Sequence, residues 1–225
     1  MTDMTTDYKF VHAKRKGSQG CLPLPAPARQ NAAVKAPETF LGMPCKKITA
    51  VVPPIEERKA RRNEFNMNVR AKFLEHLAKT QRPQLKALGL TDRQIAKMKK
   101  GRTPAGFNTH HKVSIYAGGS NDFSNLLLIR DKPYHAMVHY HLINPQMRKL
   151  EAGDKRSVVF PIPEGNIYIP DKQFRHLQRD AEDNRVSYGK TGKEYREKNF
   201  NKPFMDDVRK AEAFAHALLK KTRGR

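Results

Sequence analysis

The sequence predicts an α+β protein, because helix patterns and strand patterns occupy separate stretches of the chain. Residues 55–102 carry apolar side chains at helical spacing, and residues 106–129 have the pattern of a strand, a loop and a second strand. Residues 150–225 contain two further strand-like runs and a final helical run. With 225 residues, the chain is long enough to bury a substantial core. We therefore expect a strand–strand–helix core with preceding helices and a C-terminal α/β extension.

Composition divides the chain into three segments, 1–54, 55–149 and 150–225. The first is rich in proline and includes CLPLPAPARQ, and prolines interrupt both helices and central strands. We expect it to be a leader, either a docking or delivery segment or a poorly ordered tail. The second segment holds the helices and the strand–strand–helix core. The third is a basic extension whose role the sequence does not indicate.

Three helices are predicted ahead of the core. The first begins at Ile55, and its apolar residues recur at helical spacing: Phe65, Val69, Phe73, Leu74 and Leu77. A second, short helix follows Pro83. A third starts at Thr91, a good N-cap residue, and ends just before Gly101. Its inward-facing residues are expected to be Ile95 and Met98.

The core itself is predicted to be two antiparallel strands and a helix. The first strand is FNTHHKVSIY, the turn is AGGSND and the returning strand is FSNLLLI. The helix is expected from Asp131, with Pro133 in its first turn, to about Asn144, before Pro145. Farther on, SVVFPI and NIYI predict strands, and PFMDDVRKAEAFAHALLKKTR predicts the last helix.

The net charge of +22 at pH 7 indicates a polyanionic partner. Nucleic acid is the leading candidate, ahead of anionic lipid and acidic protein. Between residues 56 and 102, Lys and Arg outnumber Asp and Glu by 14 to 5, which suits a helical surface lying against a phosphate backbone. The alternative is an ordinary solvated basic surface.

Cysteine content and hydropathy exclude some classes of protein. The chain has two cysteines, Cys21 and Cys45, which do not form a metal-binding pair, so we expect reduced thiols. Any metal must then be held by His, Asp or Glu. No apolar run approaches the roughly 18 residues of a membrane span. The N-terminus MTDMTTDYKF lacks the pattern of a Sec signal peptide.

Histidines form the most informative pattern. His110 and His111 are adjacent on the first strand, and neighbouring strand residues point to opposite faces. His135 and His139 are four residues apart on the following helix, so they share one face and can chelate one cation. His141 falls on another face. One interpretation gives His110, His135 and His139 a metal and leaves His111 for proton transfer; the others are a structural zinc site or histidines satisfied within the core.

In this order, HHKVSIYAGG, SNDFSNLLLI and PYHAMVH resemble the His-Asn-His (HNH) endonucleases, which have the ββα-metal fold. The likeness is greatest to the DNase domains of colicins and pyocins and to nuclease toxins associated with type VI secretion. It covers residues 106–141, and more loosely the preceding stretch GLTDRQIAKMKKGRTPAGFNTHH. Residues 1–54 and 150–225 lie outside it.

The resemblance implies a site for one divalent metal ion. The ligands of the family fall on His110 and His135, and the third ligand of colicin-type members falls on His139. The metal is Zn, Ni, Mg or Mn, and the residues do not decide which. Colicin-type domains place a Glu before the double histidine, whereas this chain has Asn108, so any role of that Glu is in doubt.

The resemblance also implies which residues would be catalytic together with His110. The general base of the family falls on His111, and its middle Asn falls on Asn125, whose side chain would bridge the loop and orient His111. Asn121 is the competing candidate for that Asn. Gly118 and Gly119 would give the loop its conformational freedom.

The implied activity is hydrolysis of DNA phosphodiester bonds with little sequence preference, leaving 3′-hydroxyl and 5′-phosphate ends. Arg102 and Lys112 flank the motif and are candidate phosphate contacts, or ordinary surface cations. The resemblance further implies an antibacterial toxin made in a bacterial cytoplasm, delivered into the cytoplasm of a target cell by a secretion-system carrier or chaperone, and neutralised by an acidic immunity protein. Two alternatives stay open: a phage or mobile-element nicking endonuclease, and a non-enzymatic nucleic-acid-binding protein with a structural zinc.

Overall fold

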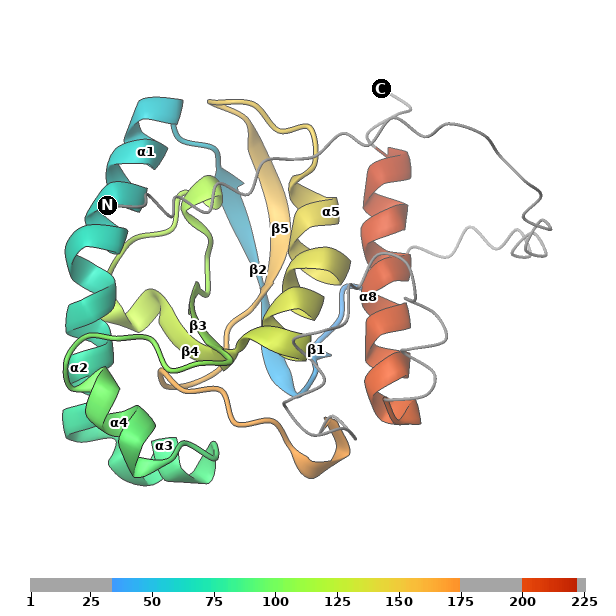
Figure 1. Cartoon of the computed structure of the whole chain (residues 1–225). Coiled ribbons are helices and arrows are strands. Elements are labelled where there is room, and N and C mark those ends of the chain that lie inside the picture. Colours follow the sequence, from blue (N-terminus) through green and yellow to red (C-terminus); the bar gives the residue numbers. More distant parts are fainter. Residues whose placement is uncertain (1–33, 175–199, 222–225) are drawn as a thin grey trace, which may run out of the picture. The chain divides into compact units, whose positions relative to one another are not determined.

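Two antiparallel sheets and a set of helices make up the part of the protein that the structure describes, residues 34–174 and 200–221 of a computed structural model (Figure 1). One sheet has three strands in the order β1-β2-β5, and the other is the hairpin β3-β4. The predicted α+β class is confirmed. None of the described helices is both long and apolar enough to cross a membrane.

The three-stranded sheet pairs strands that precede the long helical segment with a strand that follows the hairpin. Its strands are β1 (Thr39–Phe40), β2 (Met43–Val51) and β5 (Lys155–Pro161). β2 pairs antiparallel with β5 from Cys45↔Pro161 to Val51↔Lys155. Residues 39–40 and 43–51, which lie in the proline-rich first segment, thus form strands of this sheet. Pro44 is tolerated near the start of β2 because the ladder uses its carbonyl, which accepts a hydrogen bond from the Ile162 N–H at 2.7 Å. The rest of the predicted leader, residues 1–33, lies outside the described residues.

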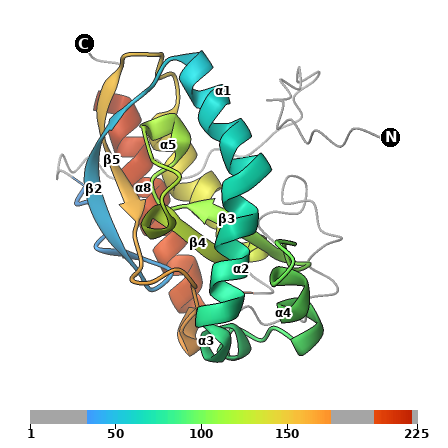
Figure 2. The ribbon, with the colours of Figure 1, turned by 90° about the vertical axis from the view of Figure 1, so that its left-hand side faces the viewer.

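A long helical segment follows, as the apolar spacing predicts. It consists of α1 (Ile55–Glu64), the π-helical η1 (Phe65–Val69) and α2 (Arg70–Thr80), which run on from one another (Figure 2). No side chain of α1 is buried, whereas Phe65 in η1 and four residues of α2 are. The N-terminal part of the segment therefore keeps an exposed, charged surface.

Two short helices complete the first core. They are α3 (Arg82–Ala87) and α4 (Asp92–Met98). Thr91 caps α4 through a reciprocal capping box with Gln94, as its position predicts. This core contains the buried faces of α2, α3 and α4 together with Leu126 and Leu128 of β4.

The hairpin consists of β3 (Phe107–His111) and β4 (Leu126–Arg130), and its loop carries two short 3-10 helices, η2 (Ile115–Ala117) and η3 (Phe123–Asn125). The predicted first strand continued to Tyr116, and this part of the prediction is wrong. Val113 hydrogen-bonds the side chain of Asn125 instead of a partner strand, so the ladder ends at His111.

β4 lies between two cores because its side chains alternate between its faces. Leu127 and Ile129 pack into a second, larger core with residues of β1, β2, β5 and the helices that follow β4. This strand therefore fixes the hairpin against both halves of the protein.

The helical segment after β4 consists of η4 (Asp131–His135), η5 (Val138–Ile143) and α5 (Asn144–Met147). The predicted end at Asn144 is wrong by one turn. The segment changes from π-helical to α-helical at Asn144 and continues past Pro145 to Met147.

The C-terminal part completes the larger core. It contains η6 (Lys172–Phe174) and α8 (Lys202–Lys221), and Phe204, Val208 and Ala211 of α8 are fully buried. The strand predicted at NIYI reduces to an isolated bridge between Ile167 and Leu128. The segment assigned to a separate extension thus shares its core with the hairpin. Residues 175–199 lie outside the described residues.

Candidate active site

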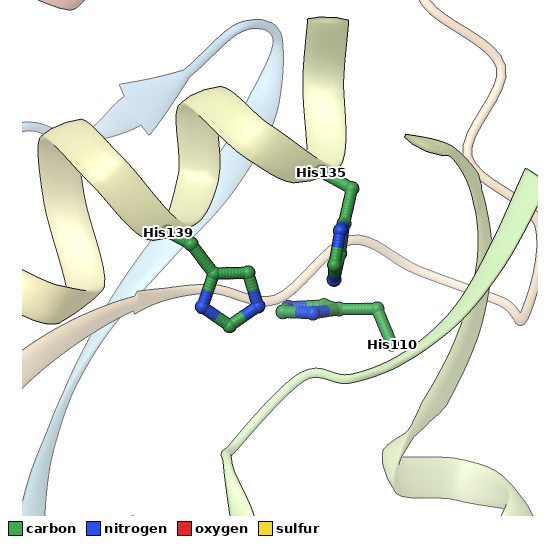
Figure 3. A group of neighbouring side chains, drawn as sticks. All are labelled: His110, His135 and His139. Atoms are coloured by element: carbon green, nitrogen blue, oxygen red, sulfur yellow. The ribbon is translucent and has the colours of Figure 1, made fainter. Parts of the chain in front are cut away.

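Three histidines from two elements meet at the C-terminal end of β3 (Figure 3). His110 comes from β3, and His135 and His139 come from the helical segment after β4. One ring nitrogen of each lies within 4.8 Å of the others. The ring centroids are 5.2 Å apart for His110 and His135, 5.0 Å for His110 and His139, and 4.6 Å for His135 and His139. The three side chains predicted to share one metal thus lie close to one another.

His110 is the buried member of the group, with 4% of its surface exposed. Its Nε2 atom has no hydrogen-bond partner. Burial, and then the neighbouring His139 and His135, hold the pKa of His110 well below its usual range, so the ring is neutral. A buried nitrogen without a partner costs free energy unless something binds it, and a divalent cation at the centre of the group would do so.

His135 is oriented by a carboxylate. Its Nδ1 lies 3.1 Å from Oδ1 of Asp131, and the same oxygen accepts a hydrogen bond from Nδ2 of Asn108 at 3.3 Å. Since a carboxylate only accepts, Nδ1 of His135 carries the proton and its Nε2 lone pair is free for a metal. This is the carboxylate–histidine arrangement that usually supports a metal ligand.

His139 lies one helical turn after His135, as the four-residue spacing predicts. Burial, and then the nearby His135, lower its pKa to about 4, against a hydrogen bond with Asn144 that raises it. A neutral ring is the form that binds metal ions. His141 turns away, as predicted, and its Nδ1 lies 2.6 Å from Oε1 of Glu212 on α8.

His111 has different surroundings from its neighbour in sequence. Its ring lies against Phe65, with 4.5 Å between centroids, and its Nε2 lies 3.0 Å from Oδ1 of Asn121. The amide of Asn121 is held in this orientation because its Nδ2 donates to the Arg61 carbonyl at 2.9 Å and to Glu64 at 2.8 Å. His111 therefore donates from Nε2 and keeps its lone pair on Nδ1. Burial lowers its pKa to about 4, although the bond with Asn121 opposes this, and the charge of Arg62 adds to the lowering.

Asn125 fastens the loop of the hairpin. Its Oδ1 accepts from the Val113 N–H at 2.9 Å, and its Nδ2 donates to the carbonyls of Val113 at 3.0 Å and Ser120 at 2.8 Å. The two roles expected of one asparagine are thus divided. Asn125 bridges the loop, and Asn121 contacts His111.

Gly119 allows the loop to close tightly. A Cβ atom at this position would lie 1.8 Å from the carbonyl oxygen of Val113, so a side chain cannot be accommodated. Gly118 has φ of 90°, a conformation that favours glycine. Arg61 of α1 donates to the carbonyls of both glycines, at 3.1 and 3.0 Å. The loop is therefore held from inside by Asn125 and from outside by α1.

No family model and no solved structure matches the chain. One curated protein is similar. It is the uncharacterised protein YhhZ of Escherichia coli (strain K12), 39% identical over 114 residues, which are 50% of this chain. The match covers 28% of that protein, so the chain spans less than a third of its relative. Because that protein is uncharacterised, the similarity transfers no activity.

The two basic residues predicted to contact phosphate have unequal positions. Lys112 follows His111 directly and is 7% exposed, and burial, followed by the charge of Lys46, lowers its pKa. Arg102 is exposed after α4, and its backbone N–H donates to the Lys97 carbonyl at 3.1 Å. Lys112 thus belongs to the surroundings of the site, whereas nothing in its position ties Arg102 to it.

Three residues at the site were missed. Asp131 could have been found from the sequence, because it precedes His135 by four residues, the spacing of one helical turn. Asn108 was noted only as a departure from the family pattern, although it supports Asp131. Arg62 carried no local signal, because it lies 49 residues before His111 in the chain.

Proposed function

We propose that the protein is a metal-dependent endonuclease of the HNH type, which hydrolyses DNA with little sequence preference. The observation that carries this proposal is the buried, unpartnered Nε2 of His110 at the meeting point of His135 and His139. A neutral histidine with a defined free nitrogen, His111, is its neighbour in sequence. A cation site beside a proton acceptor is the minimum that phosphodiester hydrolysis requires.

The three imidazoles suit one divalent cation, of which Zn²⁺ and Ni²⁺ fit nitrogen ligands best and Mg²⁺ and Mn²⁺ require oxygen from substrate and water. When bound, the cation would offset negative charge on the phosphate and on the leaving 3′ oxygen. Asp131 keeps His135 in the ligating tautomer, and Asn144 holds His139.

His111 would take the proton from the attacking water. Its Nδ1 carries the lone pair, and Asn121 fixes the ring through Nε2. Asn125 and Gly119 keep the loop closed, and with it the position of Asn121. The products would be a 3′-hydroxyl and a 5′-phosphate.

A structural zinc site is the second candidate. Structural zinc is usually held by four protein ligands, whereas catalytic zinc has three and an open position. Within residues 34–174 and 200–221, the group has three members. That number favours the catalytic alternative.

The biological setting that we propose is an antibacterial toxin delivered into the cytoplasm of a target cell through a secretion-system carrier or chaperone. Because this protein has a net charge of +22, its natural inhibitor would be an acidic immunity protein. A phage or mobile-element nicking enzyme is the alternative setting. Toxicity that a small acidic neighbouring gene product relieves would support the first, and single-strand nicks without toxicity would support the second.

Digestion of supercoiled plasmid tests the activity. The protein should cut in the presence of one or more of Mg²⁺, Mn²⁺, Ni²⁺ and Zn²⁺. His111→Ala should lower the cleavage rate by about 100-fold or more, because a general base contributes about that much, and should still bind metal in calorimetry. His135→Ala should lose both cleavage and metal affinity.

His141→Ala is the matched control, because His141 lies on the same helical segment but faces α8. It should keep both properties within a factor of a few. Normal cutting by His111→Ala would refute the assignment of the base. Tight Zn²⁺ binding without cleavage by the unmodified protein would favour the structural site.

A further inference from the structure

One surface of the long helical segment carries three arginines, Arg58, Arg62 and Arg70, which we call the arginine row. α1, which provides two of them, buries none of its side chains. Arg62 is exposed, and Arg58 and Arg70 are half-buried. The row is therefore available to a partner.

No carboxylate neutralises the row among the described residues. The acidic residues of α1 engage other groups: Glu56 pairs with Lys59, Glu57 pairs with Arg61, and Glu64 accepts from Asn121. The row instead lies over aromatic rings. The guanidinium of Arg58 is 4.6 Å from the centroid of Tyr116, and those of Arg62 and Arg70 are each 5.8 Å from that of Phe65. The Nε atom of Arg58 is buried and has no hydrogen-bond partner.

The π-helical η1 brings Arg70 into line with the other two. Twelve residues of regular α-helix make about 3.3 turns, which would rotate Arg70 by about a third of a turn from Arg58. The wider turn of η1 takes up one extra residue, as the hydrogen bond from the Arg70 N–H to the Phe65 carbonyl indicates. Arg58 and Arg70 are then separated by about 3.1 turns, so they lie on nearly the same side of the helix. Arg62 and Arg70 consequently lie over the same ring. Such π-bulges are frequent at functional sites.

The row runs beside the candidate active site. Phe65, which lies under Arg62 and Arg70, packs its ring against His111. The guanidinium of Arg62 is 5.8 Å from the centroid of this same ring. The ring of Phe65 therefore connects the row to the candidate base.

We propose that Arg58, Arg62 and Arg70 bind phosphates along one nucleic-acid strand and lead that strand past His111. The four residues from Arg58 to Arg62 advance about 6 Å, close to two nucleotides of one strand measured along a duplex axis. The eight residues from Arg62 to Arg70 advance about 12 Å, which is between three and four nucleotides. Guanidinium groups bind phosphates with paired hydrogen bonds, and no carboxylate within residues 34–174 and 200–221 pairs with the row and would compete. The surrounding face is charged, unlike the apolar face that a membrane-surface helix inserts. This inference rests on the proposed function for its substrate class.

Binding without cleavage tests the row. Fluorescence anisotropy of a fluorescein-labelled oligonucleotide, single-stranded or duplex, is measured in EDTA so that no turnover occurs. The variant Arg58→Gln, Arg62→Gln, Arg70→Gln is compared with Lys59→Gln, Lys72→Gln, Lys79→Gln, which removes the same charge from other exposed positions of the same helical segment. The row variant should bind at least about tenfold more weakly, and its salt dependence should fall by about two to three units for duplex. The affinity of the lysine variant for DNA should fall by about threefold or less.

Equal losses in the two variants would overturn the proposal, because net charge alone would then explain binding. A circular-dichroism melt verifies that both variants fold, and replacing the three arginines with lysine should restore most of the salt dependence. Loss of binding to phosphatidylserine vesicles together with unchanged DNA binding would assign the row to a membrane instead. If the unmodified protein cuts no plasmid but its DNA binding depends on the row, the proposed activity is refuted and the binding role of the row is supported. If the protein cuts plasmid but its DNA binding does not depend on the row, only the binding role of the row is refuted.

Discussion

Two adjacent histidines have unlike environments, and this difference is the main feature of the site at the scale of single residues. His110 faces the helical segment after β4, and His111 faces η1, because successive strand residues point to opposite faces. Strand geometry predicts this alternation from the sequence, but not the contacts that each ring makes. Asn121 and Asn125, left as alternatives, both take part, one at the ring of His111 and one at the loop.

Asp131 carries a prediction at the same scale. Asp131→Ala removes the acceptor from Nδ1 of His135, so the affinity for Zn²⁺ or Ni²⁺ should fall by about 10–100-fold in isothermal titration calorimetry. Asp131→Asn, which keeps an acceptor oxygen, should lose less. Asp154→Ala, which changes an exposed carboxylate far along the chain, should bind as the unmodified protein does. Unchanged affinity in Asp131→Ala would refute the orienting role.

At the scale of elements, the two sides of the hairpin loop pack tightly against each other without regular strand pairing. β3 ends at His111, and from there the backbone bonds to the side chain of Asn125. The β-prone residues up to Tyr116 predicted a longer strand, since sequence reports the preference of each residue but not the side chain that competes for its backbone. The helix starts were better predicted, because the capping box at Thr91 is a contact between residues three apart.

Gly119→Ala tests the tight packing of the loop. A methyl group would overlap the carbonyl of Val113, so the free energy of unfolding should fall by about 1–3 kcal/mol or more, and plasmid cleavage should fall with it. The control is Gly165→Ala, where φ is 68° and nothing lies near the new atom. Gly165→Ala should lower the free energy of unfolding by about 1–2 kcal/mol and leave plasmid cleavage unchanged. Equal loss of cleavage in both variants would contradict a specific role for the loop.

At the scale of the whole molecule, the segments before and after the hairpin form one core with it. β2 pairs with β5, and residues of α8 pack in the same cluster as Leu127 and Val138. The division into leader, core and extension followed proline content and charge, which describe the local chain. Pairing between strands more than 100 residues apart leaves no such local pattern.

Phe204→Ala measures that coupling. The side chain is fully buried on α8, so its removal should lower the free energy of unfolding in urea by about 3–5 kcal/mol. The measurement is made in EDTA, because a bound metal would add stability by mass action. Tyr140→Ala, at a position with 60% exposure, should change stability by about 0.5 kcal/mol or less. A similar small change in Phe204→Ala would indicate that α8 contributes little to the core.

The sequence by itself determined the α+β class, the long first helix, the hairpin order and the grouping of His110, His135 and His139. The class, the helix and the shared face of His135 and His139 follow from short spacings, which strand and helix geometry convert into positions in space, whereas the placement of His110 beside them follows from the family resemblance. Only the tertiary structure decided that Asn108 supports Asp131, that Asn121 holds His111, and that the arginine row runs beside the site. Those contacts join separate elements, and the burial of two apolar cores against β4, rather than any local pattern, brings these elements together.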